Sequence, residues 1–234
     1  MFFNRLTEPK DGYPYVIMMS APTIDGKMTV KRGMKGSIGP YAREELAYEL
    51  AEVRAMVKGI MVGGNTIVVD NPSLTVRGVE SKHVPARIIV DPEGVIPLDA
   101  KVLNDGQAQT YVAVTEKTES AWIDEINAKK NVKTIKCGKN DFVDLDLLMR
   151  ELYQKGVDVL LVEGGGTLNW YMLQSHLVNE IRILYIPIIV GGANNVSFAE
   201  GNGCTSLEDV VRLEIEECKL IGNFPFFRFK PVYS

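Results

Sequence analysis

The sequence predicts an α/β fold with a mostly parallel central sheet, flanked by helices and ending in a C-terminal antiparallel β-hairpin. From about residue 13 to residue 180, short apolar runs alternate with amphipathic segments, as in strands joined by crossover helices. After Glu180 the patterns indicate strands only, which is typical of antiparallel strands added at one edge of a sheet. No change in composition marks a boundary, so we expect a single domain over residues 1–234.

The first half of the chain contains three strand signals. The first strand is predicted in YPYVIMMS (Tyr13–Ser20), and a glycine-rich loop follows at residues 31–40. A helix is predicted to begin after Pro40, because leucine and valine recur at helical spacing: Leu46, Leu50, Val53 and Val57. Ile60–Val62 is predicted as a strand that leads into a glycine pair and a short helical piece. ARIIVD (Ala86–Asp91) is a continuous apolar run, typical of the interior of a parallel sheet.

In the second half, three strand-then-helix units precede the strand-only end. TYVAVT leads to a helix near Ser120–Ala128, and VKTIKC leads to DLDLLMRELYQKG. Asp144 is the expected N-cap and Gly156 the expected C-cap of that second helix. VDVLLVE is predicted as a strand that runs into three consecutive glycines and an amphipathic helix. The final strands are expected in EIRILYIPIIV, VVRLEIEECKLIG and FPFFRFKPV.

Composition and charge exclude several classes of protein. The net charge of −4 and the pI near 5.4 lack the basic character of a nucleic-acid-binding protein. The three cysteines lie far apart, which argues against a disulfide framework and a zinc site. His83 and His176 fit no metal or triad spacing, so we interpret both as structural and expect no metal. The sequence shows no signal-peptide pattern and no apolar run long enough to span a membrane, so we expect a cytoplasmic protein.

Two glycine turns are the main candidates for a binding site. Gly164-Gly165-Gly166-Thr167 joins a predicted strand to a helix, where glycines let the backbone approach a ligand and helix N–H groups favour phosphate. Gly63-Gly64-Asn65-Thr66 repeats this arrangement. The Gly164–Thr167 turn matches neither a P-loop nor a Rossmann G-x-G-x-x-G. Because ligands of open α/β sheets lie beyond the carboxyl ends of strands, the two turns can hold the two sides of a dinucleotide.

Several charged residues near these turns have two interpretations. Glu163 either satisfies backbone donors or accepts hydrogen bonds and protons from a polar substrate. Arg54 and Arg77 are either surface charges or phosphate ligands. Three aspartates adjoin turn residues and are interpreted as turn formers, with a cofactor-lining loop as the alternative for Asp70: Asp25, Asp70 and Asp91.

The order of these motifs resembles the pyrimidine reductase of riboflavin biosynthesis, a family with a dihydrofolate-reductase-like fold. The resemblance extends over TIDGK, VRAMVKGIMVGGNTIVVDNPSLTVR, ARIIVD, VLLVEGGGTLN and YIPIIVGG, roughly residues 13–229. The segments DNPSLTVR and VEGGGTL are its most specific parts. The resemblance implies NADPH as cofactor and a ribosylamino-pyrimidine 5′-phosphate as substrate, whose ribosyl group is reduced to ribityl. It also implies a homodimer, for which the apolar stretch Ile181–Val190 is a possible interface or a core strand.

The resemblance also implies roles for residues at matching positions. NADPH is expected to contact Ala21, Thr66, Asp70, Gly164, Gly165, Gly166, Thr167, Leu168, Asn169, Trp170 and Tyr171. The substrate is expected to contact Ser37, Arg54, Leu74, Arg77 and Glu163, with the arginines on its phosphate. Glu163 is expected to face the reacting sugar and is the candidate catalytic residue.

Departures from the family pattern leave some alternatives open. Pro92 stands where relatives have a small hydroxyl residue, and proline cannot donate a side-chain hydrogen bond to the 2′-phosphate of NADPH, so NADH stays open. The deaminase motifs H-x-E and P-C-x-x-C are absent, so we expect a stand-alone reductase acting on the diamino pyrimidinone, with the deaminated form as the alternative. A reductase of a pterin or other substrate and a non-catalytic nucleotide-binding domain are the remaining alternatives.

Overall fold

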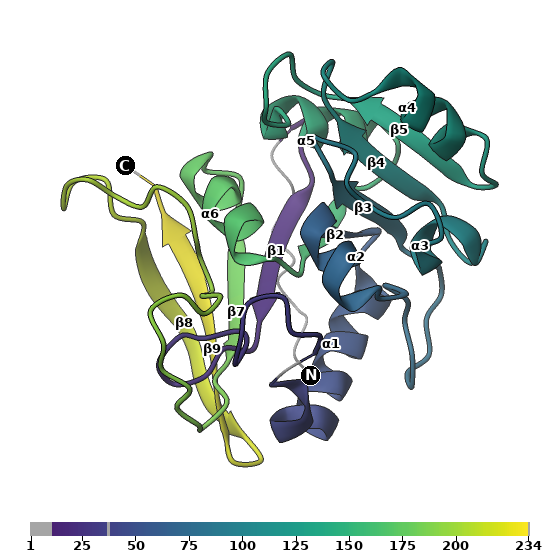
Figure 1. Ribbon diagram of the computed structural model, residues 1–234. Coiled ribbons are helices and arrows are strands. Elements are labelled where there is room, and N and C mark those ends of the chain that lie inside the picture. Colours follow the sequence, from purple (N-terminus) through teal and green to yellow (C-terminus); the bar gives the residue numbers. More distant parts are fainter. Residues whose placement is uncertain (1–10, 37, 234) are drawn as a thin grey trace.

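The computed structural model describes residues 11–36 and 38–233, and the strands of these residues form one nine-stranded sheet in the order β5-β4-β3-β2-β6-β1-β7-β9-β8 (Figure 1). The strands are β1 Tyr15–Ser20, β2 Gly59–Gly63, β3 Ala86–Val90, β4 Thr110–Val114, β5 Val132–Lys136, β6 Val159–Val162, β7 Glu180–Leu184, β8 Arg212–Ile221 and β9 Phe224–Val232. The helices are the 3₁₀ turn η1 Gly39–Ala42, then α1 Arg43–Met56, α2 Gly64–Asp70, α3 Lys101–Asn104, α4 Ser120–Asn127, α5 Leu145–Gln154 and α6 Gly166–Gln174.

The direction of the strands confirms the predicted fold class. The seven strands from β5 to β7 in the sheet order are parallel, and β9 and β8 add an antiparallel hairpin beside β7. β1 is the first strand in the chain but lies between β6 and β7, in the interior of the sheet. Its six residues are all buried, as expected for a strand covered on both faces.

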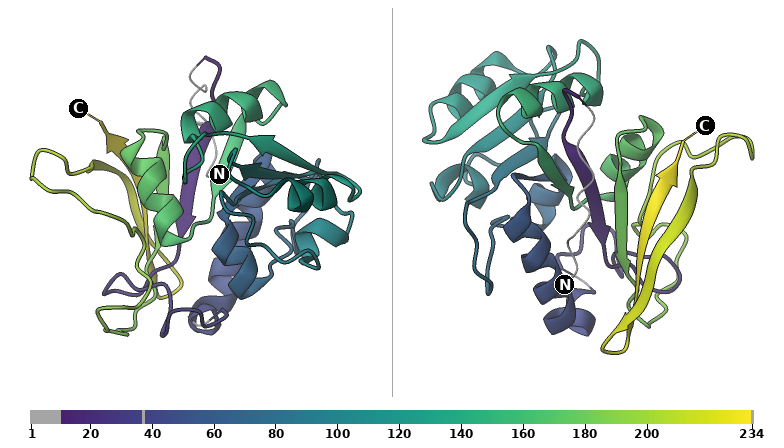
Figure 2. Two further views of the ribbon diagram at one scale, coloured as in Figure 1. Left: turned by 45° about the horizontal axis from the view of Figure 1, so that its top comes forward. Right: turned by 180° about the vertical axis from the view of Figure 1, so that it is seen from behind.

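Helices cover both faces of the parallel part of the sheet, as the views in Figure 2 show. α5 and α6 pack on one face through residues such as Leu148 and Met172. α1 to α4 pack on the other face, for example through Val53 and Ile126. No helix in the described ranges is long and apolar enough to cross a membrane.

Local structure follows the predictions except at three places. The Asp144 side chain accepts a hydrogen bond from the Leu147 N–H (3.0 Å), which confirms the predicted N-cap of α5. The C-cap of α5 is Lys155, and Gly156 follows it with a φ of 84°. The four-residue helix α3 was not predicted. β7 ends at Leu184, earlier than the predicted run to residue 190, and Pro187 lies in the part that is not a strand.

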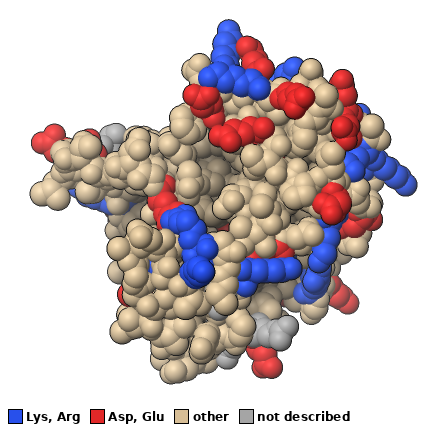
Figure 3. Space-filling view, viewed as in Figure 1, with Lys and Arg blue, Asp and Glu red and all other residues tan. Residues whose placement is uncertain are grey.

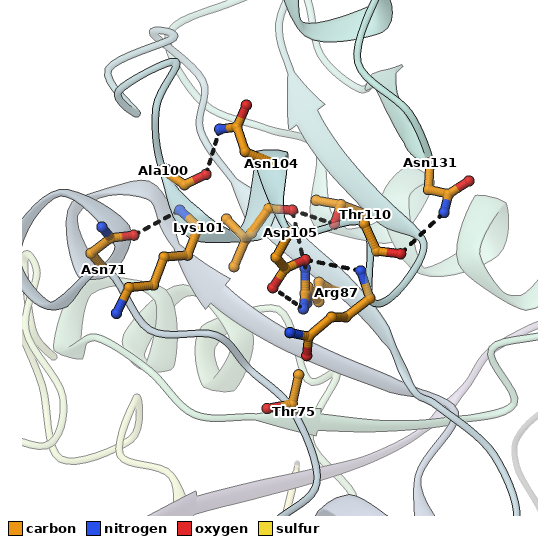
Figure 4. A network of polar contacts seen from close by, with 12 residues as sticks. Asn71, Thr75, Arg87, Ala100, Lys101, Asn104, Asp105, Thr110 and Asn131 are labelled. Atoms are coloured by element: carbon orange, nitrogen blue, oxygen red, sulfur yellow. Dashed lines mark hydrogen bonds and ion pairs between the residues drawn. The ribbon is translucent and has the colours of Figure 1, made fainter.

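A buried polar network fixes the segment that follows α2 (Figure 4). The fully buried Arg87 guanidinium on β3 forms two 2.7 Å hydrogen bonds with Asp105, just after α3. Asn71 ends α2 with a left-handed φ of 43°, and its side-chain oxygen accepts from the Lys101 N–H at the start of α3 (2.9 Å). The DNPSLT segment is thereby tied to α3, and through α3 to the sheet.

Candidate active site

The two glycine turns lie side by side at the carboxyl ends of β2 and β6. The Gly63 N–H donates to the Gly164 carbonyl (2.9 Å), and the Gly165 N–H donates to Thr66 Oγ1 (3.2 Å). Gly164 has a φ of 98°, a conformation that glycine adopts without strain, and the peptide bond that follows it is cis. α2 and α6 both begin at these turns without a side-chain N-cap, so N–H groups of both helices face this edge of the sheet.

Two clefts meet at these turns. The central cleft opens beside β1 and β6, and its lining includes Ser20, Thr29, Thr66, Asp70, Glu163 and Asn169. The side cleft opens beyond β3, between its following turn and the start of α5, and its lining includes Pro92, Glu93, Asp141, Phe142, Asp146 and Tyr171. Four residues line both clefts: Gly63, Asn65, Thr167 and Leu168. An elongated ligand can therefore extend from one cleft into the other across the glycine turns.

Glu163 stands at the end of β6 on the wall of the central cleft and is held by Arg54 of α1. The Arg54 Nε and Nη2 each donate to one oxygen of the Glu163 carboxylate, both at 2.6 Å, and Nη1 donates to the Thr75 carbonyl at 3.0 Å. The two side chains are only 16% and 12% exposed. Burial is the largest single influence and acts to lower the pKa of Arg54, but the charge of Glu163 and its hydrogen bonds together outweigh burial and raise the pKa above its usual value. The bidentate contact therefore fixes the orientation of the Glu163 carboxylate.

Within the described part of the chain, three buried polar atoms without a hydrogen-bond partner belong to residues that line the central cleft. They are the hydroxyls of Ser20 and Thr29 and the side-chain oxygen of Asn169, whose amide nitrogen donates to the Phe198 carbonyl (2.8 Å). Unpaired buried polar atoms are rare in native proteins because each costs about 1–3 kcal/mol. Their gathering at one cleft indicates a polar ligand that supplies the missing partners.

Two loops close the open side of the central cleft: residues 21–36 and residues 186–200. Asp25 joins them, because its carboxylate accepts from Thr23 Oγ1 (2.6 Å) and from the N–H groups of Val190 (3.2 Å) and Gly191 (2.6 Å). Arg32 and Glu200 form a bidentate pair at the mouth (3.2 and 2.7 Å). The Glu200 N–H donates to the Gly166 carbonyl (2.9 Å), which ties the second loop to the start of α6.

Most residues expected to contact the cofactor lie at the two clefts. Thr66, Asp70 and the run Gly164–Asn169 line the central cleft, and Tyr171 lines the side cleft. Ala21 lies at the end of β1 in a small adjoining pocket that also includes Glu163. Trp170 lies elsewhere, in a separate cavity where Gly201 packs against its indole. The structure therefore does not bring Trp170 to either cleft.

The residues expected to contact the substrate are more dispersed. Arg77 is exposed, and its Nε donates to Thr75 Oγ1 (3.2 Å). Leu74 has a left-handed φ of 47° and its side chain is buried in the core, so only its backbone can face a ligand. Ser37 lies outside the described residues. Arg54 forms an ion pair with Glu163, and this pairing was not predicted from the sequence.

Sequence reasoning missed Ser20, Thr29 and the Arg32–Glu200 pair. Ser20 ends the first strand and carried a visible signal, since strand ends are where ligands of such sheets lie. Thr29 and Arg32 lie in a segment without a recognisable motif. The partners Arg32 and Glu200 are 168 residues apart, so no local pattern joins them.

Comparison with solved structures identifies the class of fold. The structure matches Acinetobacter baumannii RibD with a TM-score of 0.77 at 22% sequence identity, covering 95% of this chain and 59% of that one. This chain thus spans about three fifths of that protein. The match shows that the chain shares an α/β fold with a mostly parallel sheet and a C-terminal antiparallel hairpin, as predicted.

Sequence comparison identifies the family. The RibD C-terminal domain family matches residues 14–224, and the chain belongs to this family. The 2,5-diamino-6-ribosylamino-4(3H)-pyrimidinone 5′-phosphate reductase of Aquifex aeolicus is 40% identical over 203 residues, covering 86% of this chain and 89% of that protein. The enzyme of the same name from Methanothermobacter thermautotrophicus is 36% identical over 212 residues, covering 90% and 94%. The predicted family is therefore confirmed.

Proposed function

We propose that this protein reduces the ribosyl group of 2,5-diamino-6-ribosylamino-4(3H)-pyrimidinone 5′-phosphate to ribityl in riboflavin biosynthesis. The observation that carries the proposal is the position of Glu163, which Arg54 holds on the wall of the central cleft. The two glycine turns and the three unpaired polar atoms belong to the same cleft. The relatives of similar length share this activity by name. A cytoplasmic location, expected from the sequence, is part of the same proposal.

The residues at the clefts suit a reduced nicotinamide dinucleotide, the cofactor class that a reductase of this family implies. The N–H groups at the start of α6 favour a pyrophosphate, and the unpaired groups of Ser20, Thr29 and Asn169 suit a carboxamide or sugar hydroxyls. Phe142 and Tyr171 form an aromatic pair (centroids 5.5 Å apart) in the side cleft, which suits a flat base. When bound, such a cofactor would supply the hydride that reduces C1 of the sugar in its imine form.

The chain's own task is to orient the sugar and exclude water. Arg54 fixes the Glu163 carboxylate, so that the carboxylate can accept hydrogen bonds from sugar or pyrimidine donors without reorganising. Arg77 is exposed and keeps donors for the substrate phosphate, whereas the donors of Arg54 are largely used by Glu163 and Thr75. We therefore assign the phosphate to Arg77 and the positioning of Glu163 to Arg54.

The proposal includes a homodimer, with the β8–β9 hairpin as its interface. The strand β7, which contains the first residues of the stretch Ile181–Val190, cannot form the dimer interface. It lies buried between β1 and β9. β8 is an edge strand, and Leu213, Ile215 and Leu220 on it are exposed. Exposed aliphatic side chains on an edge strand are a liability unless another chain covers them.

The test is an absorbance assay that follows oxidation of the reduced nicotinamide by purified protein. The diamino pyrimidinone phosphate, its deaminated form and dihydrofolate are compared as substrates. We expect rapid oxidation with the diamino compound and none with dihydrofolate. Faster turnover of the deaminated form would reverse the assigned order of reduction and deamination. Oxidation with dihydrofolate alone would make the protein a pterin reductase, and dinucleotide binding without any turnover would make it a nucleotide-binding protein.

A further inference from the structure

We propose that the side cleft selects NADH over NADPH, and that Glu93 is the residue responsible. The inference rests on the proposed function, because it concerns the adenosine end of the dinucleotide that the reductase uses. It departs from the NADPH that the family resemblance implies. A carboxylate at the end of a strand suits the 2′-hydroxyl of NADH, whereas a 2′-phosphate requires cationic or hydroxyl donors.

The charges around the side cleft are acidic. Of its described lining residues, none is Lys or Arg, whereas five are carboxylates: Asp91, Glu93, Asp141, Asp144 and Asp146. In Figure 3, acidic side chains border the hollow on this face of the molecule. A 2′-phosphate adds nearly two negative charges near neutral pH, so its presence in this cleft is unfavourable. A 2′-hydroxyl adds no charge and can donate a hydrogen bond.

Four of the five carboxylates are already engaged. Asp91 is almost fully buried and accepts from the Val95 and Ile96 N–H groups, both at 3.0 Å. Asp144 caps α5. Asp141 pairs with Lys117 (2.5 Å), and Asp146 accepts from Arg150 Nε (3.0 Å) and from the Tyr13 hydroxyl (2.6 Å). Glu93 is exposed and makes no hydrogen bond or ion pair with the rest of the described chain, so its carboxylate is available to a ligand.

The turn after β3 also lacks donors for a phosphate. Pro92 has neither an N–H nor a polar side chain. Two hydroxyls that lie next to this turn, Thr115 Oγ1 and Thr118 Oγ1, both donate to the Pro92 carbonyl (3.1 and 2.8 Å). The cations near the rim, Lys117 and Arg150, are paired with the aspartates named above. A 2′-phosphate at this turn would thus meet Glu93, with both nearby hydroxyls donating elsewhere and both nearby cations already paired.

The test is the ratio of the two dissociation constants, Kd(NADPH) to Kd(NADH), measured by calorimetry on the protein without substrate. We expect a ratio of about ten. The free energy of one or two charge repulsions at a solvated site corresponds to a ratio of this size. Glu93→Gln removes the repulsion and should lower the ratio about fivefold, chiefly by tightening NADPH. Glu125→Gln, the same change at an exposed position on α4 outside both clefts, is the matched control and should leave the ratio unchanged.

The dependence of the Kd ratio on ionic strength shows whether charge repulsion between Glu93 and the 2′-phosphate causes the selectivity, because salt screens charges. At about 1 M salt the Debye length falls to about 3 Å, so the ratio should fall towards one if Glu93 repels the 2′-phosphate. If the unaltered protein binds NADPH as tightly as NADH or more tightly, the inference is overturned, but the proposed reductase function still stands. An unchanged ratio in Glu93→Gln, or one that rises with salt, overturns the role of Glu93. Failure of the folded protein to bind either dinucleotide overturns the proposed function itself, and the inference with it.

Discussion

At the scale of single residues, Glu163 gives the first prediction, because the proposed function assigns it a chemical role and the structure pairs it with Arg54. Its carboxylate is held by two charge-assisted hydrogen bonds from Arg54 on the wall of the central cleft. Glu163→Gln keeps the shape but loses the charge. We expect kcat to fall by about a hundredfold or more, as for loss of a group that acts in proton or charge movement, while dinucleotide Kd changes little. Steady-state kinetics and calorimetry measure the two quantities separately.

The matched control for this variant is Glu180→Gln. Glu180 is likewise a carboxylate paired with an arginine, Arg182, but it is more deeply buried and lies on β7 outside both clefts. Both substitutions should lower the free energy of unfolding, because each leaves a buried guanidinium with a weaker partner. Only Glu163→Gln should reduce kcat selectively. Equal kinetic losses in the two variants would show that Glu163 acts through stability alone.

The hydroxyl of Ser20 gives a prediction in which stability and activity change in opposite directions. It is buried at the end of β1 and has no hydrogen-bond partner among the residues that the structure describes. Ser20→Ala should therefore raise the free energy of unfolding by about 1 kcal/mol, because an unsatisfied polar group is removed. If the hydroxyl binds the ligand, kcat/KM should fall about tenfold, as for loss of one hydrogen bond. Denaturant unfolding and kinetics on the same preparation give both values.

Thr110 is the control for Ser20, because its buried hydroxyl has a hydrogen-bond partner. Its hydroxyl is equally buried but donates to the Val102 carbonyl (2.8 Å), at the amino end of β4 and away from the clefts. Thr110→Val should lower stability by about 1 kcal/mol and leave kcat/KM unchanged. If Ser20→Ala behaved like Thr110→Val, the Ser20 hydroxyl would have a partner in solution and no role in binding.

The sequence predicted those parts of the site whose residues are contiguous in the chain, and it did not predict contacts between residues that are far apart in the chain. The turn at Gly164–Thr167 and Glu163 beside it were predictable, because glycines, strand and helix signals are contiguous there. Arg54 and Glu163 were each assigned separately to the substrate, but their pairing joins positions 109 residues apart. The unpaired state of Ser20 is a property of its surroundings in three dimensions, which no residue pattern records.

At the scale of elements, the loops 21–36 and 186–200 are joined at Asp25, which gives a pH-dependent prediction. Hydrogen bonds from the Thr23 hydroxyl and then from the Gly191 N–H lower the pKa of Asp25 to about 2. Because this value is below the ordinary one near 4, the contact stabilises the folded protein fully above pH about 4 and is lost as pH falls towards 2. Asp25→Asn should abolish this part of the pH dependence, and acid-dependent urea unfolding of both proteins measures it.

The same substitution should loosen the two loops without unfolding the sheet. We expect faster hydrogen exchange at the Gly191 N–H and a higher KM for the dinucleotide, because both loops line the central cleft. Asp124→Asn on α4, an exposed aspartate far along the chain from either loop, is the control and should change neither. Unchanged exchange at Gly191 in Asp25→Asn would mean that the backbone contacts between the loops suffice.

Elements with strong periodicity were predictable and marginal ones were not. α5 has an apolar face, a capping aspartate and a glycine beyond its end, so its existence and start were foreseen. α3 has four residues, too few for a periodic signal, and it is held by its contacts with Asn71 and Arg87. β7 ends at Leu184, although the Tyr185 N–H still donates to the Pro225 carbonyl of β9 (2.8 Å), and a continuous apolar run does not reveal this end.

At the scale of the whole molecule, the class of fold follows from the sequence but the order of the strands does not. Alternating strands and helices specify a parallel sheet, yet several orders satisfy that pattern. The position of β1 between β6 and β7 brings Ser20 to the cleft wall that Glu163 shares, and it depends on pairings across more than 140 residues. Such contacts are decided by packing of the complete sheet.

On one face of the β8–β9 hairpin, the aliphatic side chains of β8 are exposed, and they give the prediction for the assembly. Residues directly opposite in an antiparallel pair share a face, so Leu213, Ile215 and Leu220 share the face of Pro231, Phe229 and Pro225. Ile215 is 63% and Leu220 69% exposed. Burying this face against a second copy removes these side chains from water and covers the edge strand.

We therefore expect sedimentation to give a mass twice the 26.0 kDa of the chain. Ile215→Lys should give the monomer, because an unpaired ammonium buried at the interface costs several kcal/mol and weakens association by about a thousandfold. Val84→Lys changes another exposed aliphatic residue, in the loop before β3, and should leave the dimer intact. A monomer at all concentrations for the unaltered protein would refute the dimer, whereas a dimer that survives Ile215→Lys would place its interface on another surface.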